Sequence, residues 1–169
     1  ITIQDISISW PTNGWVSSTP AEVGMNPALL ADAASYAGGS GMISRGGYAV
    51  LTWGDINQRY DVKSVTKSIG SSALGLAVTD SLVNMTDLAQ QYLPDIGTPP
   101  IANSLPGWLD SVSLQHLATH TAGFDKSGGY IEQLYAPGST WAYSDGGANW
   151  LADVLTVIYG EDLKNLLFN

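Results

Sequence analysis

The spacing of apolar residues along the chain predicts mainly helices. In residues 27–37 and 146–159, apolar side chains recur at helical intervals with polar residues between them. Asn26 and Pro27 form a typical helix start, and Gly160 follows the second segment as a typical helix end. Both segments are therefore predicted to be amphipathic helices that bury one side.

Residues 64–79 show a different pattern. They contain no proline and are apolar on nearly every side of a helical projection, with small residues between the larger ones. A helix of this kind is typically buried, so we expect a central, buried helix here. Shorter helices are expected in residues 86–93, 113–119 and 161–168.

Strands are expected only near the start of the chain. Residues 42–44 and 48–53 are predicted to pair across a turn that contains two glycines. Glycine and proline make residues 98–107 and 122–140 loops. The chain therefore divides into an extended lead-in, a helix with the first strands of a sheet, and a mostly helical region, over residues 1–26, 27–63 and 64–169.

Composition and charge narrow the class of protein. Of 169 residues, 44% are hydrophobic and 12% are charged, which excludes a disordered chain. Six basic residues against 15 acidic ones give a net charge of -9, which disfavours binding to nucleic acid. No apolar run reaches the roughly 18 residues of a membrane span. Cysteine is absent, so disulfides and thiolate metal sites are excluded.

The cellular compartment is only weakly indicated. The chain begins with Ile1 rather than Met, which is compatible with removal of a leader. Asn84 opens an N-glycosylation triplet, Asn-Met-Thr, although such triplets often arise by chance. These features favour a secreted or periplasmic protein.

Ser64 and Lys67 are the first candidates for chemistry. Their spacing of three places both side chains on one face at the start of the predicted helix. A serine hydroxyl becomes a nucleophile when a base takes its proton, and a lysine whose pKa is lowered by burial can be that base. The alternative is that Ser64 only caps the helix.

Tyr143 and Asp145 form the second candidate group, just before the helix at 146–159. A tyrosine in this position can direct its hydroxyl into a cleft and act as an acid or base if a nearby ammonium lowers its pKa. In the structural alternative, Tyr143 is a core aromatic residue and either Ser144 or Asp145 is the helix cap.

Two other patterns have structural explanations. His116 and His120 have a spacing of four that could bind zinc, but Leu117 occupies the place of the glutamate in the metalloprotease pattern, so backbone-bonding histidines are favoured. The six tryptophans could belong to a small carbohydrate-binding module, which would consist mainly of strands.

Three segments together resemble the serine β-lactamase and penicillin-binding-protein superfamily, in particular its class C β-lactamase and family VIII carboxylesterase branch. The first is Ser64-Val65-Thr66-Lys67. The second, HLATHTAG at residues 116–123, is similar to the HLLTHTSG stretch of that family. The third, PGSTWAYSD at residues 137–145, is similar to its PGxxFxYSN stretch.

The resemblance implies an α/β fold of the β-lactamase and transpeptidase kind, with a helical subdomain and the N-terminal strands of an antiparallel sheet. It implies an acyl-enzyme mechanism on esters or amides, including β-lactams and D-amino-acid peptides, with no cofactor. Ser64 would attack the carbonyl, Lys67 would help to deprotonate it, and Tyr143 would act as base or proton relay. A relative that binds ligands without catalysis is the alternative.

Asp145 departs from the family pattern, which usually has Asn at this position. An Asn amide can donate to a substrate carbonyl, whereas an ionised Asp only accepts hydrogen bonds and keeps Lys67 protonated. The base role then shifts toward Tyr143, and esters become better substrates than amides.

The family's C-terminal strands, which carry its third motif and one oxyanion-hole N–H, have no counterpart in these 169 residues. A C-terminal fragment of the same protein is therefore expected as a partner, and without it the sheet has an open edge.

We predict that the isolated 169-residue chain is poorly stable and a poor catalyst, because losing one oxyanion-hole donor costs roughly 10²–10³ in rate. Ester turnover by the purified chain measures this. Saturating turnover that Ser64→Ala abolishes would contradict the prediction.

Overall fold

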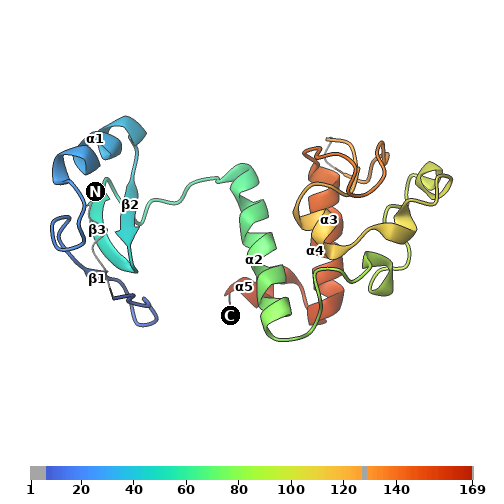
Figure 1. Ribbon diagram of the computed structural model, residues 1–169, viewed down its shortest axis with the longest axis horizontal. Helices are drawn as coiled ribbons and strands as arrows, with labels where there is room; N and C mark the ends of the chain where they lie inside the picture. The colour runs from blue at the N-terminus through green and yellow to red at the C-terminus, as the bar shows by residue number, and fades with distance from the viewer. Residues whose placement is uncertain (1–6, 127–128, 169) are drawn as a thin grey trace. The chain divides into compact units, whose positions relative to one another are not determined.

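The computed structural model describes residues 7–126 and 129–168, and it describes side chains as far as residue 166. The chain divides between Asp61 and Val62 into two units, which are treated separately (Figure 1). All four predicted reactive residues belong to the second unit. Among the described helices, none is long and apolar enough to cross a membrane.

The first unit is a small mixed sheet with one helix, α1 (Pro27–Ala37). The predicted pair is present as β2 (Gly41–Arg45) and β3 (Tyr48–Trp53), which run antiparallel. A two-residue strand, β1 (Val16–Ser17), adds parallel to β3 and gives the order β1-β3-β2. Two residues are too few to show an alternating pattern, so the predicted irregular lead-in did not include this strand.

Local chemistry explains the ends of these elements. The Asn26 side chain accepts hydrogen bonds from the backbone N–H groups of Ala28 and Leu29 and so caps α1 as predicted. In the β2–β3 turn, Gly47 has a φ of 82°, and a Cβ there would lie 1.5 Å from the Ser9 carbonyl oxygen. Glycine is therefore required at this turn.

The second unit is helical. Its long helices are α2 (Thr66–Thr79) and α4 (Asp145–Tyr159), and its shorter ones are α3 (Leu114–Ala118) and α5 (Leu163–Phe168). Four single turns of 3₁₀ helix complete the described elements: η1 (Lys63–Val65), η2 (Ala89–Gln91), η3 (Ile101–Ser104) and η4 (Leu109–Ser111). This helical unit excludes the strand-built carbohydrate-binding module.

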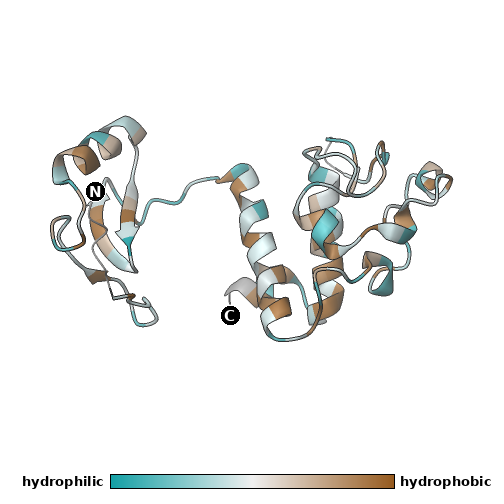
Figure 2. Cartoon of the chain, viewed as in Figure 1, coloured by the Kyte–Doolittle hydropathy of each residue, from teal (hydrophilic) through white to brown (hydrophobic). Residues whose placement is uncertain are grey.

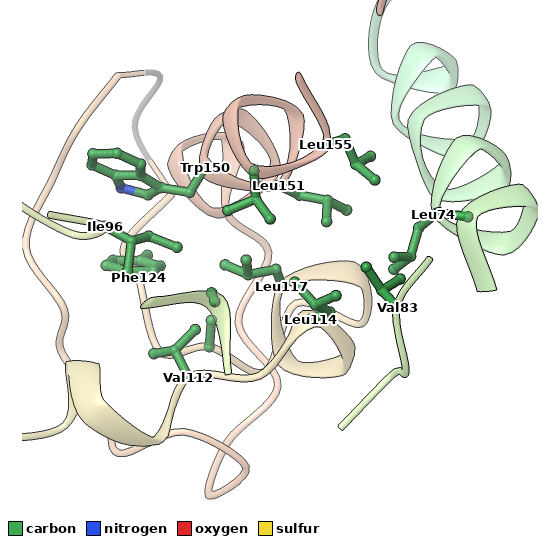
Figure 3. Packing of buried hydrophobic residues seen from close by; sticks show 14 of the residues in the cluster. Leu74, Val83, Ile96, Val112, Leu114, Leu117, Phe124, Trp150, Leu151 and Leu155 are labelled. Atoms are coloured by element: carbon green, nitrogen blue, oxygen red, sulfur yellow. The ribbon is translucent and has the colours of Figure 1, made fainter. Parts of the chain in front are cut away.

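The core of the second unit forms where α4 packs on α2 and α3. Figure 3 shows side chains from these helices converging with those of the loops between them. Leu74 of α2, Leu117 of α3 and Leu155 of α4 are all buried. Burying each such side chain contributes about 1.5–3 kcal/mol, so this packing holds α2 and α4 together.

One predicted property of α2 is wrong. Ala73, Leu74 and Ala77 are buried in this unit, but Ile69 and Leu76 are 43% and 55% exposed. In Figure 2 brown, apolar residues occur along α2 as well as α4. Composition shows that a helix can be covered all round, but only its neighbours decide which faces are covered.

The helix predicted at residues 86–93 is also wrong. Only η2 forms there, because the Asp87 carboxylate accepts a hydrogen bond from the backbone N–H of Asn84 (2.8 Å) and one from the Tyr92 hydroxyl (2.8 Å). These bonds favour a turn over a regular helix. The predicted loop at 98–107 contains the short η3.

Asn103 joins three loop segments inside the second unit. Its side chain is 3% exposed. Its amide nitrogen donates to the carbonyl oxygens of Gly97 and Ile131, both at 2.9 Å, and its oxygen accepts from the backbone N–H of Gln133 at 2.8 Å. These segments lie outside the named strands, and the side-chain amide supplies hydrogen-bond partners to their buried backbone groups.

We expect Asn103→Ala to lower the free energy of unfolding by about 2–4 kcal/mol, because it leaves buried backbone groups without partners. Urea unfolding of the chain measures this. Asn165→Ala, at an exposed position of α5, is the matched control and should change stability by less than about 0.5 kcal/mol. Equal effects of the two substitutions would contradict the role given to Asn103.

Candidate active site

Ser64 lies in the 3₁₀ turn η1, directly before α2, with its side chain exposed. The preceding residue, Lys63, has a φ of 50°, a left-handed conformation that residues other than glycine seldom adopt. The hydroxyl of Thr66 donates to the Lys63 carbonyl across this turn. Ser64 thus lies in a sharp turn just before the N-terminus of α2, and not within the helix.

Two side chains reach the Ser64 hydroxyl oxygen. The Lys67 ammonium donates to it at 3.1 Å, and the Tyr143 hydroxyl donates to it at 2.7 Å. Ser64 and Tyr143 are 79 positions apart in sequence. The packing of α2 on α4 brings them together, since both helices begin at the same end of the unit (Figure 1).

Lys67 forms an ion pair with Asp145, the first residue of α4. Its ammonium lies 2.5 Å from a carboxylate oxygen of Asp145, and the side chains are 23% and 32% exposed. The hydrogen bond to Asp145, and then that to Tyr143, raise the pKa of Lys67 above its usual value. Lys67 is therefore a cation, as expected from the charge of Asp145, and not the base with a lowered pKa that the Ser64–Lys67 spacing alone allows.

The same pair keeps Asp145 ionised. Its hydrogen bond with Lys67 lowers the pKa of the Asp145 carboxyl, and the more distant charge of Lys126 adds to this effect. The carboxylate also lies in the first turn of α4, where the helix dipole favours negative charge. Asp145 thus holds Lys67 in place and keeps it protonated, as the difference between Asp and Asn predicts.

Tyr143 has the lowered pKa expected of a potential base. The hydrogen bond with Ser64 lowers this pKa most and that with Lys67 next, whereas desolvation and then the Asp145 charge raise it. The contact with Ser64 reverses when Tyr143 ionises: the serine hydroxyl then donates to the phenolate. The Lys67 ammonium also lies 5.2 Å from the centroid of the tyrosine ring.

Ser144 fixes the position of Tyr143. The hydroxyl of Ser144 is buried; it donates to the Asp125 carbonyl (2.7 Å) and accepts from the Gly147 N–H (2.8 Å), which makes Ser144 the cap of α4. Of the two caps considered from sequence, Asp145 is therefore excluded and remains available to Lys67.

His120 supports the other side of this turn. Its ring stacks on that of Tyr143 with centroids 4.8 Å apart. Its Nδ1 accepts from the Ser144 backbone N–H at 3.2 Å, and its carbonyl accepts from the N–H of Ala142 at 2.9 Å. Burial and then the charge of Lys67 lower the pKa of His120, so the ring is neutral and its Nδ1 can accept.

His116 also bonds to the backbone, since its Nδ1 accepts from the Ser113 N–H in a reciprocal cap of α3. Both histidines thus have the backbone contacts expected of structural residues. No group of three metal-ligating side chains occurs within residues 7–126 and 129–168.

Lys126 was not singled out from sequence. Its ammonium lies 5.9 Å from the ring centroid of Tyr143. Its position three residues after Gly123, the end of the second family-like segment, is the one feature that could have drawn attention to it. The described site therefore has two ammonium groups near one tyrosine, rather than one.

The sequence model of the beta-lactamase family matches residues 26–167. The chain belongs to the beta-lactamase family. The match includes the segments that hold Ser64, Lys67, Tyr143 and Asp145, and it bears out the resemblance to the serine β-lactamase and penicillin-binding-protein superfamily.

Two similar proteins show how much of a relative's length this chain covers. An uncharacterized protein of Alkalihalophilus pseudofirmus is 28% identical over 109 residues, which are 64% of this chain and 30% of that protein. A solved structure named "putative 6-aminohexanoate-dimer hydrolase", from Bacillus anthracis, matches 96% of this chain and 53% of its own with a TM-score of 0.60 at 12% identity. The fold is therefore β-lactamase-like, and the chain spans about a third to half the length of these relatives.

We expect Asp145→Asn to lower the pKa of Lys67, because the variant removes the carboxylate that most favours the charged amine. NMR titration of ¹³Cε-labelled lysine measures this, with the Lys67 signal assigned by its loss in Lys67→Met. Asp153→Asn, which changes another carboxylate of α4, is the control and should leave Lys67 unchanged. An unaltered titration of Lys67 in Asp145→Asn would show that the ion pair does not control its charge.

Proposed function

We propose that this chain carries the catalytic residues of a serine hydrolase that forms an acyl-enzyme with ester or amide substrates. One observation carries the proposal: the Ser64 oxygen lies 2.7 Å from the Tyr143 hydroxyl and 3.1 Å from the Lys67 ammonium. A nucleophile, a tyrosine with lowered pKa and a fixed cation within hydrogen-bond reach satisfy the geometric requirement for an activated serine. The hydrolase name of the Bacillus anthracis structure agrees with this class of reaction.

Tyr143 is the base in this proposal. Its phenolate takes the hydroxyl proton of Ser64 while the serine oxygen bonds to the substrate carbonyl carbon. The tetrahedral intermediate collapses when the bond to the leaving group breaks and Tyr143 returns the proton to the leaving oxygen or nitrogen. Water then repeats the sequence on the acyl-enzyme, with Tyr143 again as base, and releases the acid.

Lys67 acts as a fixed positive charge. Its raised pKa makes it a poor base, but its ammonium stabilises the tyrosine phenolate and donates to the serine oxygen. Asp145 holds this ammonium in place. Because an ionised Asp145 cannot donate to a substrate amide, we propose that esters are hydrolysed faster than amides.

Full turnover is expected to need more of the fold than these residues. The resemblance implies a C-terminal strand that supplies one oxyanion-hole N–H, from a continuation of the protein or from a second chain. The match to 53% of the Bacillus anthracis chain supports this expectation.

A ligand-binding protein without turnover is the second candidate. The observation that favours it is the 2.5 Å contact of Asp145 with Lys67, which reduces the cationic character of the site. Ligand binding that survives Ser64→Ala, together with no covalent adduct in the parent protein, would favour this alternative.

Intact-mass spectrometry of the whole natural protein after treatment with a fluorophosphonate tests the proposal. We expect one covalent adduct on Ser64, none in Ser64→Ala, and labelling slowed by about 10²–10⁴-fold in Tyr143→Phe, since this is the usual contribution of a general base.

Two control variants separate chemistry from folding. Ser68→Ala changes an exposed serine of α2, and Tyr36→Phe removes a hydroxyl from a 96% exposed tyrosine of α1; both should be labelled at the parent rate. Absence of an adduct on folded parent protein would contradict the hydrolase proposal, and equal labelling of Tyr143→Phe would remove Tyr143 from it.

A further inference from the structure

Lys126 is held beside the proposed site by its backbone. Its carbonyl accepts from the N–H of Asp145 at 3.3 Å, and its own N–H donates to the Asp125 side chain at 2.7 Å. The Asp125 carbonyl in turn accepts from the Ser144 hydroxyl at 2.7 Å. The residue is therefore fixed to the start of α4, the same turn that positions Tyr143.

The side chain of Lys126 is exposed, and its ammonium lies 5.9 Å from the Tyr143 ring centroid. The hydroxyl of the same tyrosine contacts the Ser64 oxygen at 2.7 Å. A group bound to this ammonium would consequently lie next to a substrate carbonyl at Ser64.

Positive charge is rare in this chain, and the Lys126 ammonium is part of a local concentration of it near Tyr143. The chain has only four lysines and a net charge of -9, yet two of the four lysines lie within 6 Å of the Tyr143 ring centroid. The Asp145 carboxylate balances the charge of Lys67, which remains a cation, at 2.5 Å. Lys126 makes no ion pair with any carboxylate in the described part of the chain. It is thus a positive charge at the rim of the site that no ion pair of the described residues holds, although the more distant Asp145 charge interacts with it.

We propose that Lys126 is a specificity-determining residue that binds a carboxylate on the substrate, so that the preferred ester or amide carries a negative charge near its scissile carbonyl. This inference rests on the proposed function. An ammonium on a flexible stem suits such a group because it donates up to three hydrogen bonds and follows small differences in substrate length. The acidic remainder of the protein repels anions, so local binding by Lys126 is what selects them.

Matched substrate pairs on the whole natural protein test the inference. The first pair places the charge on the acyl side: 4-nitrophenyl hydrogen succinate against 4-nitrophenyl butyrate. The second places it on the leaving group: 3-acetoxybenzoate against 3-acetoxybenzamide. Acylation of Ser64 is followed by product release and by intact mass, and the ratio of kcat/KM within each pair is the readout.

We expect Lys126→Gln to lower the charged-to-neutral ratio by about fivefold in one of the two pairs, and Lys126→Glu to lower it further by a similar factor. The pair that responds identifies the side on which the carboxylate lies. Added salt should reduce the ratio in the parent and have less effect in Lys126→Gln. Lys164→Gln, on α5, is the matched control and should leave both ratios unchanged.

The ratio distinguishes recognition from any effect of Lys126 on Tyr143, because a changed base alters both members of a pair equally. Unchanged ratios in both pairs, with the Ser64 adduct still formed, would overturn the inference and leave the proposed function standing. If no substrate acylates Ser64 in folded parent protein, the proposed function and this inference both fall.

Discussion

The buried hydroxyl of Ser144 is the contact on which the site depends. It caps α4 through Gly147 and at the same time donates to the carbonyl of Asp125. The Ser144 hydroxyl oxygen therefore sets the start of α4. As a result, Tyr143 lies before the helix and Asp145 lies in its first turn. Tyr143 falls before the helix and can reach Ser64, whereas Asp145 falls inside it and meets Lys67. A helix that began one residue later would place Asp145 at the cap instead of in the first turn.

The charges at the site follow from this placement. Asp145 occupies the positive end of the α4 dipole and faces an ammonium, so both partners are held in their charged forms. Tyr143 is then the remaining group near Ser64 whose pKa moves toward neutrality. The division of roles is thus a consequence of one carboxylate, because Asn in its place would leave Lys67 without its strongest partner.

The sequence predicted those helices and strands whose ends are set by nearby cap and turn residues. The cap at Asn26, the hairpin of β2 and β3, the cap at Ser113 and the helix that ends at Gly160 all form where turn and cap residues require them. The pattern also selected the four side chains that the fold brings together. The family could be predicted because three motifs, at residues 64–67, 116–123 and 137–145, occur in the family's order. The Ser64–Lys67 spacing alone is far less specific.

The rest depends on contacts between distant segments. Neither the exposed side of α2 nor the short strand β1 could be predicted, because each is decided by what packs beside it. The turn at 86–93 depends on which donors reach the Asp87 carboxylate. The place of Lys126 beside Tyr143 could not be predicted, because its position three residues after Gly123 is its only signal in the sequence.

Ser64 and Tyr143 lie 79 positions apart in sequence, so their contact depends on the folding of the chain between them. The full set of contacts around the Ser64 oxygen exists in neither segment alone, because it forms only where α2 packs on α4. On the proposed function, the reactivity of Ser64 therefore measures folding as well as chemistry. It reports whether these two helices are in contact, and it disappears when they separate, even while each remains helical.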